Sequence, residues 1–163
     1  DMGEPIFEYS KIPVIFPNIV KKELEHLEIY YSDIMYKVYP ISMGNPHAVC
    51  FLDNIEKLNI SEVGKLIEDY KYFPNKTNVE FVQIMDNKRI KMRVWERGVG
   101  ETLGCGTGAC AATVVSYLKK FTNSELTVEL PGGNLKIIYF ENENRVKLIG
   151  DSYFVFDGKM IYK

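Results

Sequence analysis

The stretch WERGVGETLGCGTGACAA, residues 95–112, places one thiol, Cys105, between two glycines at the start of a run of small helix-forming residues. Such glycines let a backbone come close to a ligand. The first turn of a helix has unpaired N–H groups and the positive end of the helix dipole, so it can bind a substrate carboxylate without a basic side chain. The same field favours a thiolate, and we expect the pKa of Cys105 to lie below the usual value of about 8.5.

The other two cysteines are predicted to pack rather than react. Cys50 lies in the apolar stretch HAVCFLD, and Cys110 lies inside the run of small residues after Cys105. Three cysteines are odd in number and few for this length, which argues against a disulfide framework and for reduced thiols. The alternatives for Cys105 itself are a core turn and a metal site. With two histidines in the chain, C-x4-C has no recognised zinc spacing, so we expect no metal.

Length and composition indicate one soluble globular domain over residues 1–163. The chain has 46% hydrophobic and 26% charged residues, with neither repeats nor a linker. A net charge of −2, spread along the chain, gives no reason to expect a nucleic acid or membrane partner, so the ligand should be small. Without a leader or an apolar run of about 20 residues, we expect a cytoplasmic protein. Its start at Asp1, in a segment typical of the middle of a protein, suggests a fragment of something longer.

Strands dominate the predicted elements. Apolar spacing and turn residues predict helices over 61–73, capped at Ser61, and over 108–121, with an unevenly spaced helical segment over 18–29. The small residues at the start of the second helix suit the interior of a curved sheet, where strands pack against its backbone. We therefore predict an α+β fold, a largely antiparallel, strand-rich roll or barrel around a central helix. The predicted strands cover 34–42, 47–54, 79–85, 89–96, 126–130, 134–140 and 145–150.

Three separated motifs, in the same order, closely resemble diaminopimelate epimerase. They are WERGVGETLGCGTGACAA, MGNPHAV at 43–49 and FPNKTNVEFVQ at 73–83, and the resemblance covers nearly the whole chain. It implies an isomerase without pyridoxal phosphate or any other cofactor, which interconverts LL- and meso-diaminopimelate for lysine and peptidoglycan synthesis. It also implies two similar lobes, each a roll around a central helix, with the substrate between them.

The resemblance assigns this chain to the second, C-terminal lobe. Inverting a carbon requires a base on one face and an acid on the other, and in the family each lobe supplies one cysteine. The Gly-Asn-Gly type segment that precedes the first-lobe cysteine does not occur in this sequence. We therefore expect an absent N-terminal lobe as partner, a tail at 151–163 that crosses to it, an inactive isolated chain and a homodimeric whole enzyme.

The resemblance also implies a role for each residue that matches a motif. Cys105 matches the second-lobe catalytic thiol, Glu96 the carboxylate that assists its proton transfer, and His47 the histidine that assists the missing cysteine. The other matches bind substrate. Groups at its distal end would be held by Asn45, Asn78, Glu96 and Arg97, and its carboxylate by backbone amides at Gly106 and Thr107.

Some alternatives stay open at this point. Arg97 would also suit a strand surface, Asn45 and Asn78 would also suit turns, and Glu101 would either cap its loop or contact ligand. Gly104 stands where the family often has alanine. For the whole chain, the alternatives are another isomerase of the same superfamily, of the proline racemase or phenazine-pathway type, and a non-catalytic fragment that only binds or assembles.

Overall fold

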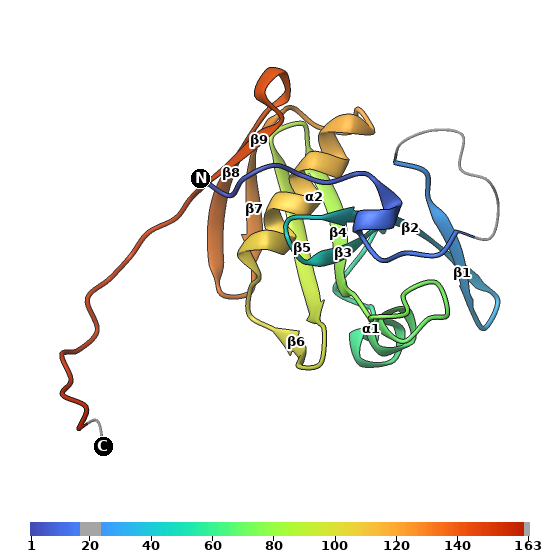
Figure 1. Ribbon diagram of the computed structural model, residues 1–163, viewed down its shortest axis with the longest axis horizontal. Coiled ribbons are helices and arrows are strands. Elements are labelled where there is room, and N and C mark those ends of the chain that lie inside the picture. The colour runs from blue at the N-terminus through green and yellow to red at the C-terminus, as the bar shows by residue number, and fades with distance from the viewer. Residues whose placement is uncertain (17–23, 162–163) are drawn as a thin grey trace.

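The computed structural model describes residues 1–16 and 24–161. In these ranges one sheet has the strand order β1-β2-β3-β4-β5-β7-β8-β9, with β6 paired to β5 (Figure 1). The helices are α1 (Ile60–Glu68) and α2 (Gly106–Leu118), and single 3-10 turns lie at Tyr9–Lys11 and Glu141–Glu143. The strands are β1 (Leu27–Tyr31), β2 (Ile34–Ser42), β3 (Pro46–Phe51), β4 (Asn78–Asp86), β5 (Arg89–Glu96), β6 (Gly100–Thr102), β7 (Glu125–Leu130), β8 (Gly133–Phe140) and β9 (Arg145–Ile149).

Two parallel pairs place the helices on opposite faces of the sheet. Neighbouring strands are antiparallel except β3 with β4 and β5 with β7. A parallel pair needs a crossover, and α1 and α2 lie in these two crossovers. Because β4 and β5 are antiparallel, the two pairs run in opposite directions. Crossovers of the same hand then bring α1 to one face and α2 to the other, which is the arrangement in Figure 1.

Alternation along the strands builds a separate core on each face. On β4, Phe81 packs in the core that contains α1, whereas the next residue, Val82, packs in the core that contains α2. On β3, Cys50 packs in the core that contains α1, and Val49 packs in the core that contains α2. Because side chains of successive strand residues point to opposite faces, every second residue of these strands faces α2.

The α2 helix is enclosed over most of its length. All nine residues from Gly108 to Ser116 are buried, and the helix contacts strands on both sides of the sheet's midline. Within the described residues β1 and β9 do not pair, so the sheet is an open roll and the barrel alternative is wrong. The N-terminal segment crosses between the two sides by isolated bridges, from Gly3 to Val146 of β9 and from Ile6 to Ser42 of β2.

The strand-rich α+β class, the central helix and the positions of the seven predicted strands are confirmed. The helix predicted over 61–73 ends earlier, at Glu68, and its N-cap is Asn59, whose carbonyl accepts from the amide of Val63 (3.1 Å). Ser61 lies inside the helix, and its hydroxyl donates to the Asn59 side chain (2.8 Å). Part of the predicted helical segment 18–29 lies outside the described residues. From Leu27 onward it is strand β1, because it pairs with β2.

Candidate active site

Cys105 is the N-cap residue of α2. Its backbone is extended (φ −136°, ψ 114°), and its carbonyl accepts the first helical hydrogen bond, from the amide of Ala109 (2.9 Å). The sulfur accepts from the backbone N–H of Gly108 and lies 3.4 Å from the hydroxyl oxygen of Thr107. The residue is 9% exposed. The amides of Gly106 and Thr107 belong to the first helical turn, where N–H groups have no acceptor within the helix.

The predicted lowering of the Cys105 pKa is wrong. Burial raises the pKa, the hydrogen bonds from Thr107 and Gly108 lower it in part, and the nearby carboxylates of Glu80 and Glu96 raise it further. The prediction considered the field of the helix alone. Desolvation of the thiolate, which depends on tertiary packing, outweighs that field.

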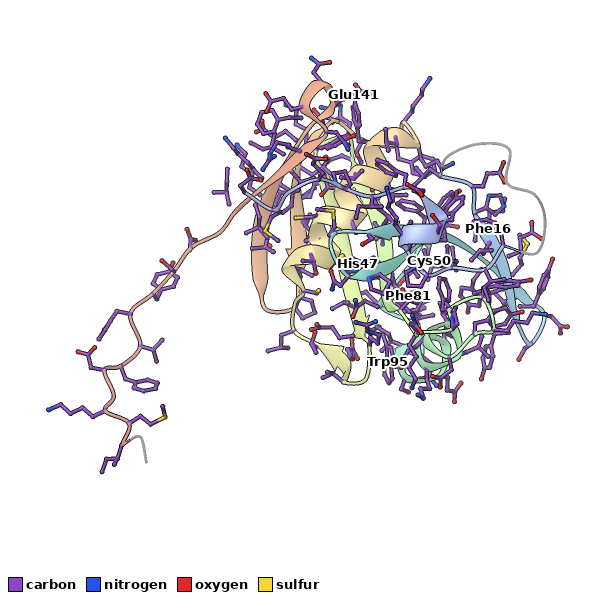
Figure 2. The ribbon with its side chains drawn as sticks, viewed as in Figure 1. Phe16, His47, Cys50, Phe81, Trp95 and Glu141 are labelled. Carbon is purple, nitrogen blue, oxygen red and sulfur yellow. The ribbon has the colours of Figure 1, made fainter. Side chains whose placement is uncertain are left out.

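The other two thiols are fully buried. Burial raises the pKa of Cys50 and of Cys110 to about 12. Cys50 lies on the α1 face of the sheet, opposite the face that carries α2 (Figure 2). Cys110 lies in the second turn of α2, packed into the core of that face.

A buried polar cluster lies beneath the first turn of α2. His47 of β3 and Glu80 of β4 are both fully buried, and the Nδ1 of the imidazole lies 2.7 Å from Oε1 of the carboxylate. Nε2 lies 3.0 Å from Oδ1 of Asn45, in the turn before β3. The amide nitrogen of Asn45 in turn donates to the hydroxyl of Thr107 (3.4 Å). The structure thus brings together three predicted site residues, Asn45, His47 and Thr107, and joins them to Cys105 through the 3.4 Å contact between Thr107 and the sulfur.

Glu80 was not among the predicted site residues. A carboxylate inside the apolar run VEFV was the available signal, because such a strand interior seldom contains an acid without a partner. One carboxylate oxygen, Oε2, has no hydrogen-bond partner. A Cβ atom added to Gly108 would lie 2.7 Å from the other oxygen, Oε1, so the glycine makes room for this carboxylate.

The remaining predicted residues lie where β4 begins and β5 ends. Glu96 accepts a short bond from the hydroxyl of Thr102 (2.6 Å). The buried Asn78 side chain accepts from the backbone amide of Arg97 and donates to the carbonyl of Pro46, both at 2.9 Å. Asn78 therefore holds the backbone of Arg97.

The guanidinium of Arg97 is exposed and contacts the chain through the carbonyl of Asn75 (3.2 Å). The carboxylate of Glu101 accepts from Arg93 Nε (2.8 Å). Glu101 thus joins β6 to β5 through this ion pair, and its role at the site stays a prediction.

A second carboxylate missed in the sequence, Glu68 at the end of α1, secures the turn after β5. Its oxygens accept from the indole N–H of Trp95 (2.8 Å) and the backbone N–H of Gly98 (2.9 Å). Burial raises its pKa, but these bonds and the ammonium groups of Lys65 and Lys76 outweigh burial and leave the pKa lowered.

A hollow of about 680 Å³ opens beside Cys105. The loop before α2, the β7–β8 turn, β9 and the start of the tail line it, whereas His47 and Glu80 lie on β3 and β4. Within the described ranges, no group of three or more His, Cys, Asp and Glu side chains is placed to hold a metal ion, and no helix is long and apolar enough to cross a membrane.

Residues 39–155 match the sequence model of the diaminopimelate epimerase family. The chain belongs to this family. It is 44% identical over 160 residues to the diaminopimelate epimerase of Methanococcus maripaludis strain C6, and 42% identical over 159 residues to that of Synechocystis sp.. Each alignment covers 98% of this chain but 57% of the relative. The chain therefore spans little more than half the length of these family members.

A solved structure supports the fold assignment. The hydroxyproline epimerase from Agrobacterium vitis, determined with bound trans-4-hydroxy-L-proline, superposes with a TM-score of 0.57 over 71% of this chain and 40% of that chain. The sequence identity is 12%, so this likeness concerns the fold alone.

Proposed function

We propose that this chain is the C-terminal lobe of a diaminopimelate epimerase and supplies one of its two catalytic cysteines. Membership of the family and coverage of 57% of its members support this assignment. The observation that carries the catalytic role is the position of Cys105. Of the thiols in the described residues, it is the one at a helix N-terminus and beside an open hollow.

The proposed reaction transfers a proton at the α-carbon of diaminopimelate. Cys105 acts on one face of this carbon, and a cysteine of the absent lobe acts on the other. The first-turn amides of Gly106 and Thr107 bind the substrate carboxylate and stabilise the negative charge that develops when the proton leaves. Because burial raises the Cys105 pKa, the resting residue is a protonated thiol and starts as the acid.

In the opposite direction Cys105 must first lose its proton. Glu96 is the proposed acceptor, since its charge acts on the thiol and its carboxylate is oriented by Thr102. Arg97 is proposed to hold the distal end of the substrate, where its exposed guanidinium can pair with a carboxylate. Asn45 and Asn78 are proposed to support that end through their contacts with Thr107 and with the Arg97 backbone.

His47 is proposed to assist the cysteine of the absent lobe. It is fully buried, and each ring nitrogen already has a partner in this chain. Any influence on the other lobe therefore passes through Asn45, which lies between the ring and the first turn of α2.

The proposal requires a second thiol from outside this chain. Cys50 packs in the core that contains α1, and Cys110 of α2 packs in the core on the other face of the sheet. Neither thiol can therefore reach the α-carbon on which Cys105 acts. The absent lobe is the proposed partner, and the tail is its proposed contact. Large apolar side chains are more than three-quarters exposed there, namely Tyr153, Phe154, Val155, Phe156, Met160 and Ile161. Figure 1 shows this segment running away from the body of the lobe.

The α-proton NMR signal of LL-diaminopimelate in heavy water tests the proposal under reducing conditions. We expect no meso isomer from this chain alone, and its formation when the separately expressed first lobe is added. The matched control is Cys105→Ser in the same mixture, which should form none. Meso isomer from this chain alone, or from the Cys105→Ser mixture, would refute the assignment of Cys105. No turnover with a correctly folded first lobe would favour a non-catalytic fragment.

A further inference from the structure

The buried cluster beneath α2 is a continuous chain of hydrogen-bonding groups that ends at the sulfur of Cys105. Its successive separations are 2.7, 3.0, 3.4 and 3.4 Å. In order, the groups are the carboxylate of Glu80, the imidazole of His47, the amide of Asn45, the hydroxyl of Thr107 and the thiol of Cys105. The sequence motifs assign Glu80 no role in catalysis, although Glu80 is the first group in this series of hydrogen bonds.

The carboxylate fixes one end of the imidazole. A carboxylate accepts hydrogen bonds, and with Glu80 in that form the Nδ1 of His47 that faces it at 2.7 Å carries the hydrogen of this contact. Both side chains are fully buried, so bulk solvent does not compete for this contact. The one variable left on the ring is therefore the hydrogen on Nε2, which faces Asn45.

The orientation of the Asn45 amide links the hydrogen on Nε2 of His47 to the hydrogen bond made by Thr107. When Nε2 carries a hydrogen, it donates to Oδ1, and the NH2 group faces Thr107, as in the structure. The hydroxyl of Thr107 then accepts from Asn45 and is free to donate to the sulfur of Cys105. When Nε2 is bare, the amide must turn to donate to it, Oδ1 faces the hydroxyl, and the Thr107 hydrogen goes to Asn45 instead.

We propose that Glu80 is a positioning residue that fixes the hydrogen of His47 on Nδ1, so that the hydrogen on Nε2 decides whether Thr107 donates to the Cys105 sulfur. A hydrogen on Nε2 then favours the thiolate, and its loss favours the thiol. This inference rests on the proposed function in giving Cys105 a chemical role. It adds a link between His47, the residue proposed to serve the absent cysteine, and the thiol of this lobe, so that the two acid–base groups of the site change state together.

The ring nitrogens of His47 provide the first test. Long-range 1H–15N spectra of the folded chain should show a hydrogen on Nδ1, with Nε2 as the nitrogen whose hydrogen is present or absent. In Glu80→Gln the amide can either accept from Nδ1 or donate to it, so signals of both tautomers should appear. A bare Nδ1 in the wild-type chain, or an unchanged spectrum in Glu80→Gln, would overturn the proposal.

A double-mutant cycle tests the link to the sulfur, with the rate of Cys105 alkylation measured as a function of pH. The charged or titratable groups that act on this thiol from β4 and β5 are Glu80 and Glu96, and Cys110 lies behind it in α2. Thr107→Val should slow alkylation at neutral pH by about three- to ten-fold, the value of one hydrogen bond. Glu80→Gln in this background should speed it, because only the direct repulsion by the carboxylate remains.

When Thr107 is intact, Glu80→Gln should either slow alkylation or speed it at least about three-fold less than it does in the Thr107→Val background. The reason is that the Thr107 hydroxyl then turns away from the sulfur. Equal effects in both backgrounds would refute the link and leave only through-space charge. Glu68→Gln, which removes a buried carboxylate of α1 on the other face of the sheet, is the matched control and should change neither readout. Equal changes in it would also refute the link. If circular dichroism shows Glu80→Gln to be unfolded, Asn45→Ala replaces it in the cycle. Neither readout uses turnover, so a failure of the epimerase assignment would not affect them.

Discussion

Gly108→Ala should disturb the buried cluster more than is usual for the addition of one methyl group. The added methyl group would lie 2.7 Å from Oε1 of Glu80, 3.2 Å from its Cγ and 3.3 Å from Cβ of Cys105. The carboxylate cannot move without lengthening its 2.7 Å contact with His47, because both side chains are fully buried. We therefore expect loss of stability together with a change at the site.

The magnitude follows from three terms. Overpacking in a dense core costs about 1–3 kcal/mol. Weakening a hydrogen bond to a charged group costs about 1.5–3 kcal/mol more. Replacing glycine inside a helix returns about 1 kcal/mol. The net loss is about 1.5–5 kcal/mol, which for a domain of this size lowers the melting temperature by about 3–20 °C.

Gly106→Ala is the matched control, two residues earlier in the same turn. Its methyl group would meet only Cδ1 of Leu148, at 3.2 Å, the far end of a flexible side chain. Its stability should change by less than about 1 kcal/mol, since the small gain in helix propensity offsets this contact. Urea unfolding of both variants measures the difference. A Gly108→Ala midpoint within error of Gly106→Ala would refute the packing of Glu80 against the α2 backbone.

Three further outcomes are expected. Iodoacetamide should label Cys105 faster than Cys50 or Cys110 in the folded chain, by peptide mapping at neutral pH, because the latter two are fully buried and their pKa is raised to about 12; faster labelling at either would contradict this. The pKa of Glu68 is lowered in the folded state, so this residue stabilises the fold at a pH above its unfolded-state pKa. That stabilisation is lost as the pH falls through its folded-state pKa. Acid titration of unfolding free energy should therefore show a shallower decline below pH 4.5 in Glu68→Gln than in wild type, and parallel curves would count against the role of this carboxylate. Truncation after Asp151 should leave the melting curve of this chain unchanged, since residues 152–161 are exposed and without regular structure. It should reduce association with the first lobe, and the idea fails if binding is unaffected.

The sequence predicted the strands well because their alternation is a local property. The same local signals do not determine which face each residue occupies. Nothing near Cys50 indicates that it faces α1, because that depends on the register of β3 with β4 across a crossover that contains a whole helix. The open sheet was likewise undetermined, since closure depends on whether β1 and β9 meet.

At the candidate site, residue types and sequence motifs predicted which residues belong to the site but not which side chains contact one another. Thr107 was predicted as a donor of its backbone amide, and its hydroxyl turns out to lie between Asn45 and Cys105. Glu80 was missed because its partner, His47, comes 33 residues earlier and becomes adjacent only through parallel pairing. The pKa of Cys105 was predicted in the wrong direction because burial has no signature in the local sequence.

The bridges made by the N-terminal segment have a consequence for how the chain reaches its native state. Gly3 pairs with Val146, and the side chains of Asp1 and Arg145 form an ion pair at 2.7 Å, so contacts that complete the enclosure of α2 join residues more than 140 positions apart. Such distant closures are slow, because the loop entropy is lost before the contact forms. During synthesis the apolar α2 emerges well before β9, and it must wait for its last strands with part of its surface uncovered. This interval is when the chain is most exposed to aggregation, and when a chaperone that binds apolar helices would protect it most.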